Sequence, residues 1–343
     1  MPKTLYKRHM SSSLRRLFVG LAALALFGAL PGAADTHAGS DRVRIAATPI
    51  PLHQDKPEIA RVGRLLYRGG LELRAHDRRF GGFSGLLVSP DGRRLIAISD
   101  HGFWLRARIV RANGRLTGLR DARMGRLLGP RGRALRGAWR DAESLARRRG
   151  GGLTVSFERH HRLLAYRGGR HGPRRPSRLA PPDGIQRARS NKGMEAMTRL
   201  AGGGLLVLTE GLGAGPGLIR GWLRTPAGKS GTWRPLAYVR TGAFLPTGAD
   251  LLPNGDVVVL ERAVSFPLGV DIRLQRLDRR DIVPGARLAG REIARLAAPF
   301  NVDNFEGIAA YRGAKGKTLL YLISDDNYQP LQRTLLMMFE LVK

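Results

Sequence analysis

One unit of sequence recurs five times along this chain and limits the possible fold more than any other feature. Each copy begins at a polar or acidic anchor, contains two short apolar runs separated by a turn, and ends at a carboxylate. The fullest copy is Asp303 to Tyr328, and the weaker ones run from Ser84 to Asp100, from Glu143 to Glu158, from Glu195 to Glu210 and from Asp250 to Glu261. Two apolar runs around a Gly-containing turn are typical of a β-hairpin. The sequence therefore predicts an array of hairpins.

The spacing of the copies favours one architecture. Anchors at positions 84, 143, 195, 250 and 306 lie 52 to 59 residues apart, close to the roughly 40 to 50 residues of a four-stranded propeller blade. Turns such as Asp-Gly are common in any β protein, but chance turns would not bring an acid to the same two places each time. We expect an all-β β-propeller with six blades, and with five blades as the alternative.

The two ends of the chain are expected to close this ring. Short β-like runs lie at Val43 to Ile50, Leu65 to Tyr67 and Leu71 to Leu73, and another lies at Thr334 to Val342. Pairing of N- and C-terminal strands leaves a propeller without an open edge. We expect residues 39–343 to form a single domain that is a monomer.

The first 38 residues resemble an export signal. Basic residues from Lys3 to Arg16 precede an apolar run from Leu17 to Leu30, and small residues follow. Arg15 and Arg16 fit a twin-arginine signal about as well as a general secretory one. The apolar run has about 14 residues, whereas a membrane-spanning helix needs roughly 20. We expect a periplasmic or secreted protein whose mature chain has no transmembrane segment.

The charge is extreme, with 59 Lys and Arg against 27 Asp and Glu and a formal net charge of +32. Such a surface attracts anions, including anionic polymers of the cell envelope. A genome-wide preference for arginine codons is the alternative explanation. Aromatic residues make up 6% of the chain and no nucleic-acid-binding motif accompanies the charge, so we expect no specific nucleic-acid partner. The absence of cysteine excludes disulfides and thiolate metal sites.

The acids at the two ends of each copy are the candidate functional residues. One repeat position holds Glu143, Glu195, Asp250 and Glu306, and the other holds Asp100, Glu158, Glu210, Glu261 and Asp325. Equivalent positions of a radial array meet around its axis, so these acids should line one mouth of the central channel. Like charges raise one another's pKa unless cations intervene, and Ca²⁺ prefers six to eight flexible oxygen ligands. We therefore predict a Ca²⁺ site, to which Asn304 can add a neutral oxygen.

Two other interpretations of these residues remain open at this point. Each acid can instead cap a turn or pair with a neighbouring arginine, which would make the ring purely structural. Lys192 and Arg262 lie beside the anchors and can compensate the negative charge directly.

The same residues carry a resemblance to a known family, the bacterial "esterase-like activity of phytase" or phytase-like proteins. The matching stretches are Phe80 to Leu86, Asp91-Gly92, Ser99 to Gly102, Asp141 to Glu143, Ser156 to Glu158, Lys192 to Ala196, Leu260 to Arg262, Asp303 to Ile308, Ser324 to Asn327 and Arg333 to Leu336. His101 stands where the family pattern has Arg. The resemblance runs from about residue 60 to the end of the chain, and it implies an exported β-propeller similar to calcium-dependent phytases.

The leading hypothesis is a cation-dependent hydrolase of phosphate or carboxylate esters that acts on a small anionic substrate. The predicted catalytic residues are Glu306 and Asp325, as base or cation ligand, and His101, Arg262 and Lys192, which would hold the substrate anion or protonate the leaving group. One alternative is a non-catalytic propeller that binds an anionic envelope component. Another is a sugar-lactone hydrolase or dehydrogenase that holds a single metal.

Overall fold

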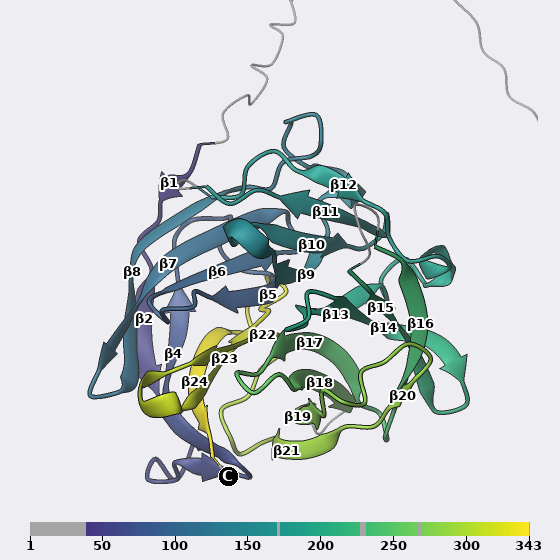
Figure 1. Ribbon diagram of the computed structural model, residues 1–343. Helices are drawn as coiled ribbons and strands as arrows, with labels where there is room; N and C mark the ends of the chain where they lie inside the picture. The colour runs from purple at the N-terminus through teal and green to yellow at the C-terminus, as the bar shows by residue number, and fades with distance from the viewer. Residues whose placement is uncertain (1–38, 170–171, 227–230, 266–268, 343) are drawn as a thin grey trace, which may run out of the picture. The chain divides into compact units, whose positions relative to one another are not determined.

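The strands of this chain pair into five separate antiparallel sheets, apart from one short parallel pair at the edge of the third. A computed structural model describes residues 39–169, 172–226, 231–265 and 269–342. Figure 1 shows the five sheets as blades around a common centre. The predicted export signal, residues 1–38, lies outside the described residues. Within the described part, no helix is long or apolar enough to cross a membrane.

The strands of the first two blades follow one another in the sequence, except for one short N-terminal strand that joins the outer edge of blade 1. Blade 1 contains, from the innermost strand outwards, β5 (Phe83–Val88), β6 (Arg94–Ser99), β7 (Phe103–Ala112), β8 (Arg115–Arg126) and β1 (Asp41–Arg42). Blade 2 contains β9 (Ala142–Arg147), β10 (Leu153–Phe157), β11 (Arg162–Tyr166) and β12 (Ser177–Leu179). Four short 3-10 turns lie in the described loops, at Gly137–Trp139, Arg149–Gly151, Ile185–Arg187 and Ala314–Gly316.

The remaining blades follow the same plan. Blade 3 contains β13 (Met194–Arg199), β14 (Leu205–Gly215), β15 (Leu218–Arg224), β16 (Trp233–Val239) and β20 (Arg287–Leu288). Blade 4 contains β17 (Leu245–Leu251), β18 (Val257–Ser265), β19 (Gly269–Leu277) and β21 (Arg291–Leu296). Blade 5 contains β22 (Phe305–Arg312), β23 (Thr318–Ser324), β24 (Thr334–Leu341), β4 (Leu65–Arg74) and β2 (Ala46–Ile50), and β3 (Arg61–Val62) pairs with β4.

The all-β propeller is confirmed, but the favoured count of six blades is wrong and the alternative of five is right. The extra blade came from counting the terminal strands as a unit of their own. In the structure β4 pairs with the C-terminal strand β24, from Thr334 opposite Leu73 to Leu341 opposite Leu65. The N-terminal strands thus complete the blade that the fifth repeat begins. Closure of the ring by both ends of the chain is confirmed.

Five hydrophobic clusters hold the blades together, one at each junction between neighbours. The cluster between blades 5 and 1, for example, packs Leu86 and Leu105 against Tyr321 and Met338, and the others join blades 4 and 5, 3 and 4, 1 and 2, and 2 and 3. The innermost strands β5, β9, β13, β17 and β22 contact one another in a closed circle. Apolar burial between sheets is the main stabilising term of such a fold, so every blade depends on two neighbours.

Candidate functional site

The innermost strand of each blade contains a β-bulge, so one of its residues has no partner on the second strand. The register between first and second strands shifts by one residue in each blade, and such a bulge re-aims the extra side chain. The residues at this position form the inner ring: Ser84, Glu143, Glu195, Thr247 and Glu306. A small residue follows each one. A Cβ added to Gly248 would lie 2.4 Å from the carbonyl oxygen of Glu306, so close approach of the inner strands requires glycine there.

A second ring lies where the second strand of each blade reaches the same end of the propeller. Its members are Asp100, Glu158, Glu210, Arg262 and Asp325. A backbone hydrogen bond repeats in four blades: the N–H of the second-ring acid donates to the carbonyl two residues before the bulged residue, over 2.9 to 3.1 Å. The acceptors are the carbonyls of Gly82, Asp141, Gly193 and Asn304. This bond fixes the second-ring acid beside the inner ring.

Blade 4 departs from the predicted equivalence, because Thr247 and Arg262 occupy its ring positions. Glu261 is buried one residue earlier, where its carboxylate binds Arg273 Nε (2.6 Å) and Tyr238 Oη (3.0 Å). Asp250 lies three residues beyond Thr247 and accepts hydrogen bonds from Thr198 Oγ1 and the N–H groups of Leu251 and Ala310. The structure therefore places Asp250 and Glu261 outside the two rings.

One side of the mouth gathers six acids, which we call the carboxylate arc: Asp100, Asp141, Glu143, Glu158, Glu195 and Asp325. Oxygen atoms of Asp141, Glu143 and Glu158 lie within 4.8 Å of one another. Asp141 also pairs with Arg159, whose side chain is 61% exposed. The Oδ1 atom of Asp100 is buried and has no hydrogen-bond partner among the described residues. Several hard oxygen donors thus converge on a small space with little compensating charge.

The electrostatics of the carboxylate arc reflect this crowding. Burial, followed by repulsion from Glu158, raises the pKa of Glu143 and of Glu195 well above the usual range. Burial and repulsion from Asp141 raise the pKa of Asp100 to about 7. Burial and repulsion from Glu306 raise the pKa of Asp325 to about 9. These carboxyl groups resist ionisation because they are buried close together. A bound cation would lower their pKa values and stabilise their charged forms.

The other side of the mouth is neutralised by the protein itself, and we call it the cation-paired arc: Lys192, Glu210, Arg262, Asn304 and Glu306. Arg262 joins Glu306 Oε1 (2.5 Å) and Glu210 Oε1 (3.2 Å), and Lys192 Nζ binds Glu210 Oε2 (2.8 Å). Burial lowers the pKa of Arg262, but the attraction of Glu306 and Glu210 outweighs it, so this pKa is raised. Here the protein supplies its own cations.

Aromatic and basic side chains flank the acids. His101, next to Asp100, stacks on Tyr328 with ring centroids 4.0 Å apart, and burial followed by Arg140 lowers the pKa of His101. Trp139, which is 52% exposed, stacks on His160 at 3.9 Å. These rings present flat apolar faces near the acids, and the neutral imidazole of His101 can exchange a proton.

The structure brings together all of the predicted site residues except Asp250 and Glu261, and it adds Asp141, which the prediction missed as a ligand. The repeat pattern already indicates Asp141. It occupies in blade 2 the position that Asn304, a predicted ligand, occupies in blade 5. The spacing between anchors likewise indicates that Asp250 and Glu261 are not the ring positions of blade 4. The two anchors lie 16, 15 and 15 residues apart in the first three copies but 11 apart from Asp250 to Glu261, whereas Thr247 and Arg262 restore 15.

The chain was compared with models of known protein families. The family model described as "Phytase-like: Esterase-like activity of phytase" matches residues 78–328, which include every member of both rings. The chain belongs to the phytase-like family. The resemblance found in the sequence is confirmed, and a search of curated proteins finds no match to this phytase-like chain.

Three solved structures similar to the phytase-like chain illustrate the low level of identity. The PQQ-bound aldose sugar dehydrogenase from Streptomyces coelicolor is 12% identical, with a TM-score of 0.43, 86% of this chain covered and 98% of that one. The Cps50 (Swd1) β-propeller domain from Myceliophteria thermophila is 10% identical, with a TM-score of 0.40 and coverage of 89% and 100%. A protein of unknown function from Dyadobacter fermentans is 12% identical, with a TM-score of 0.41 and coverage of 89% and 100%.

Proposed function

We propose that the carboxylate arc binds hard divalent cations, Ca²⁺ by its donor set, and that the mouth hydrolyses a phosphate or carboxylate ester. The observation that carries this proposal is the convergence of Asp141, Glu143 and Glu158 beside the unpartnered Oδ1 of Asp100. All four side chains offer carboxylate oxygens, the ligands that Ca²⁺ prefers. Buried like charges also destabilise the fold until a cation compensates them. The donor chemistry and the electrostatics both fit the ion.

The remaining residues of the mouth have distinct tasks in this proposal. A bound divalent cation would polarise the ester and lower the pKa of a nearby water. Asp325 is held by the N–H of Asn327, which donates to Oδ1 over 2.6 Å. Once a bound cation lowers the pKa of Asp325 and keeps it ionised, Oδ2 would be the atom that takes a proton from the attacking water. His101, fixed by its stack on Tyr328, would donate a hydrogen bond from its neutral imidazole to the leaving group, and Asp325 would pass the proton it took from water on to that group.

The substrate anion would be held by cations at the edge of the mouth. The side chains of Lys192 and Arg159 are 31% and 61% exposed, so both can reach an incoming phosphate or carboxylate. Arg262, predicted from sequence as a substrate ligand, instead links Glu210 and Glu306. We assign it the task of keeping Glu306 ionised and in place. This arrangement attracts an anionic ester to an acidic site that would otherwise repel it.

Glutamine replacement of two arc acids tests the function. We expect Glu143→Gln and Glu158→Gln to lower Ca²⁺ affinity at least about ten-fold, since each removes a charged ligand. Both should abolish Ca²⁺-dependent turnover of generic phosphate and acyl esters. Glu292→Gln, an exposed acid on the outer strand β21, is the matched control and should change neither. A wild-type protein without a Ca²⁺-dependent thermal shift and without turnover on either ester class would refute the proposal.

The compactness of the three-acid cluster favours one second candidate, a single-metal lactone hydrolase or dehydrogenase. Asp141, Glu143 and Glu158 surround a single point, which suits one ion. Mass spectrometry of the metals in purified, untreated protein separates the candidates. Several ions per chain support the ester hydrolase, one ion supports the single-metal enzyme, and none supports a non-catalytic propeller.

Export of the protein to the periplasm or beyond is part of the same proposal. It rests on the basic and apolar segments of residues 1–38, which lie outside the described residues. Cell fractionation with an antibody against the propeller tests it. Full-length protein confined to the cytoplasm would contradict it.

A further inference from the structure

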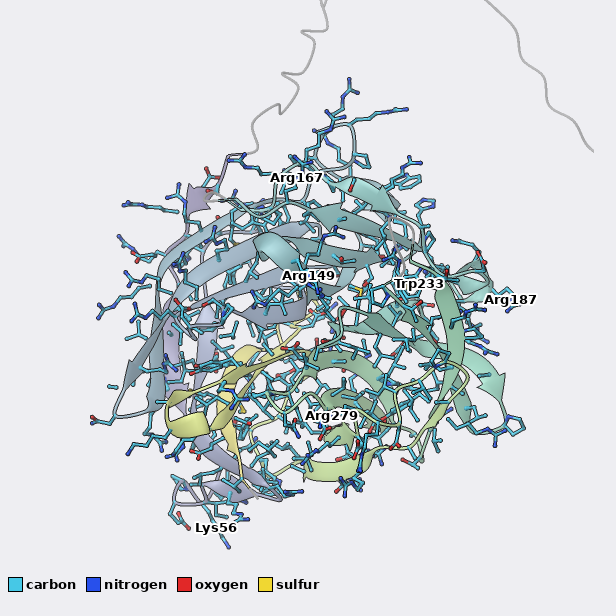
Figure 2. The ribbon with its side chains drawn as sticks, in the orientation of Figure 1. Lys56, Arg149, Arg167, Arg187, Trp233 and Arg279 are labelled. Carbon is cyan, nitrogen blue, oxygen red and sulfur yellow. The ribbon has the colours of Figure 1, made fainter. Side chains whose placement is uncertain are left out.

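The end of the propeller opposite the mouth is lined by arginines. Strand β9 runs from Ala142, beside Glu143, to Arg147, and β13 runs from Met194, beside Glu195, to Arg199. Four residues of strand span about 13 Å, longer than the screening length of about 8 Å in physiological salt, so these arginines do not neutralise the mouth. We call the set on blades 1 to 3 the arginine stripe: Arg94, Arg106, Arg147, Arg148, Arg149, Arg199 and Arg224. Figure 2 labels one of its members, Arg149.

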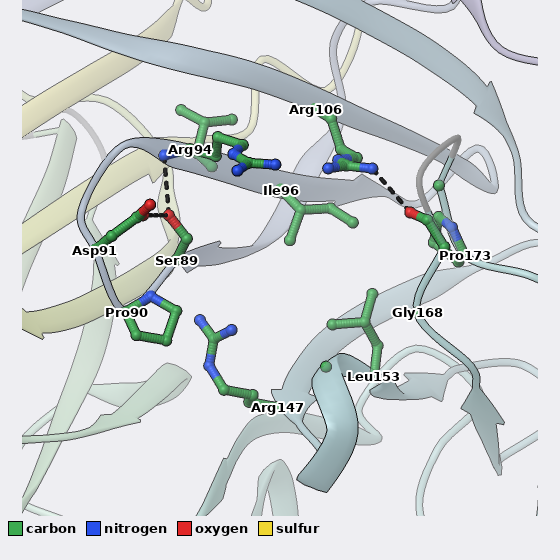
Figure 3. A pocket seen from close by; sticks show the side chains of 14 residues that line it. Ser89, Pro90, Asp91, Arg94, Ile96, Arg106, Arg147, Leu153, Gly168 and Pro173 are labelled. Carbon is green, nitrogen blue, oxygen red and sulfur yellow. Dashed lines mark hydrogen bonds between the residues drawn. The ribbon is translucent and has the colours of Figure 1, made fainter.

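A pocket of about 480 Å³ between blades 1 and 2 contains the first part of the stripe. Figure 3 shows Arg94, Arg106 and Arg147 around this pocket, from strands β6, β7 and β9. Arg106 Nη1 donates to the carbonyl of Gly169 over 3.0 Å, and Arg147 Nη2 donates to the carbonyl of Val88. Both side chains are half-buried. Their guanidinium groups are therefore held in place before any ligand arrives, which lowers the entropic cost of binding.

The charge of this pocket is positive. Its one acidic lining residue, Asp91, is engaged by Ser89 Oγ (2.5 Å) and by the N–H of Arg93 (3.0 Å). Burial, followed by repulsion from Arg94, lowers the pKa of Arg106. Arg94 and Arg106 therefore repel each other, and an oxyanion bound between them would relieve this repulsion.

A second pocket, of about 230 Å³ between blades 2 and 3, continues the stripe. It shares Arg147 with the first pocket and adds Arg148, Arg149, Arg199 and Arg224. Burial, followed by repulsion from Arg149 and Arg148, lowers the pKa of Arg199, and burial followed by Arg148 lowers that of Arg224. The two pockets are therefore adjacent compartments of one positive surface.

We propose that the arginine stripe binds an extended polyanion, with one oxyanion group in each of the two pockets. A guanidinium fork matches the two oxygens of a carboxylate or phosphate group. The described residues that line the two pockets include no aromatic ring, whereas sites for single-stranded nucleic acid characteristically stack bases on aromatic side chains. The ligand class is thus a polymer of phosphates or of carboxylates. The site lies away from the mouth and does not depend on the proposed hydrolase.

Binding of defined polymers to the full-length protein tests this proposal. The probes are linear polyphosphate and poly-L-glutamate of matched charge, measured by isothermal titration against orthophosphate and acetate, with and without Ca²⁺. We expect one polymer at least to bind ten-fold or more tightly than its monomer, since it engages both pockets. The polymer that binds more tightly identifies the oxyanion.

Charge-matched variants locate the site. Arg147→Gln, at the junction of the pockets, should lower polymer affinity about ten-fold or more. Arg149→Gln changes an exposed side chain and leaves the contact of Arg147 with Val88 intact. It should also lower polymer affinity, and it does so without risk to folding. Arg287→Gln, exposed on the outer strand β20, removes the same charge elsewhere. Equal losses in all three variants, or polymers that bind no better than their monomers, would overturn the proposal. Failure of ester hydrolysis would leave it untouched.

Discussion

The two arcs of the mouth use the same blade positions for opposite purposes. In the cation-paired arc, Arg262 stands where other blades carry an acid, and it links Glu210 to Glu306. In the carboxylate arc, Glu143, Glu158 and Glu195 face one another with no such residue between them. The residue at one repeated position therefore decides whether an arc contains its own counterion.

This contrast also explains why the arcs differ in what mutation should do to them. Removing a charge from a neutralised pair leaves its partner buried and alone, which destabilises the protein. Removing a charge from a repelling cluster relieves the remaining members.

Loss of Arg262 should cause the largest change. We expect Arg262→Gln to lower the free energy of unfolding by about 3 to 5 kcal/mol in metal-free buffer, because Glu210 and Glu306 lose their shared cation. Added Ca²⁺ should restore part of this loss, since the variant turns the cation-paired arc into a second cluster of bare acids. Urea denaturation with and without Ca²⁺ measures both effects. Arg280→Gln, an exposed control, should change stability by less than about 0.5 kcal/mol.

The metal-free protein should lose stability as pH rises. The folded pKa values of Asp100 and Asp325 are raised from 3.8 to about 7 and about 9, so the folded state holds protons that the unfolded chain has released. The stabilisation is complete below pH 4 and is lost progressively as pH rises through 7 to 9, by about 4 kcal/mol from Asp100 alone. Thermal unfolding across this range in a chelator measures it. A flat profile, or a loss of the same size with saturating Ca²⁺, would contradict this account.

Glutamine at one acid of each arc should change stability in opposite directions. Without metal, Glu195→Gln should stabilise the protein by about 1 to 2 kcal/mol, because burial and repulsion from Glu158 disfavour its charge. Glu210→Gln should destabilise it by about 1 kcal/mol, because Lys192 and Arg262 lose their partner. Ca²⁺ affinity should fall only in the first variant. Changes of the same sign in both would remove the distinction between the arcs.

The smallest expected effect concerns the aromatic stack beside Asp100. Tyr328→Leu removes the ring on which His101 stacks and should cost about 0.5 to 1.5 kcal/mol. It should also lower kcat more than it raises KM, since His101 loses its orientation. Tyr328→Phe keeps the ring and should preserve kcat, even though it loses the hydroxyl contact with Gly81. Equal kcat losses in both variants would show that the hydroxyl, not the stack, matters.

Much of the fold could be predicted because it depends on patterns that the chain repeats. Five hairpin units, each ending at an acid, predict five blades once the terminal strands are assigned to the last one. The sequence does not show that assignment, because β4 is one strand of 10 residues whose two apolar runs are separated by Arg68, Gly69 and Gly70. Its partner, β24, lies more than 260 residues away in sequence, from Leu73 to Thr334. The periodic sequence pattern predicts where strands lie, but it does not predict which strands pair at the outer edges of the blades.

The sequence predicts a site residue correctly wherever an acidic residue occupies the bulged position of the inner strand. At Glu143, Glu195 and Glu306 an acid coincides with the bulge, so choosing acids found the position. In blade 4 the bulge holds Thr247, and the choice of the nearest acids selected Asp250 and Glu261, which satisfy local hydrogen bonds instead. The division into two arcs could not be seen, because it depends on which guanidinium reaches across to which blade.

Closure of blade 5 by strands from both ends of the chain also sets the order of events in synthesis. A chain that has grown only to residue 316 has the strands of four blades but lacks β23 and β24, so β4 and β2 have no sheet to join. Asp325, which completes the carboxylate arc, also lies in this last segment. The ring therefore shuts only after β24 has been made, and the carboxylate arc is complete only from then on.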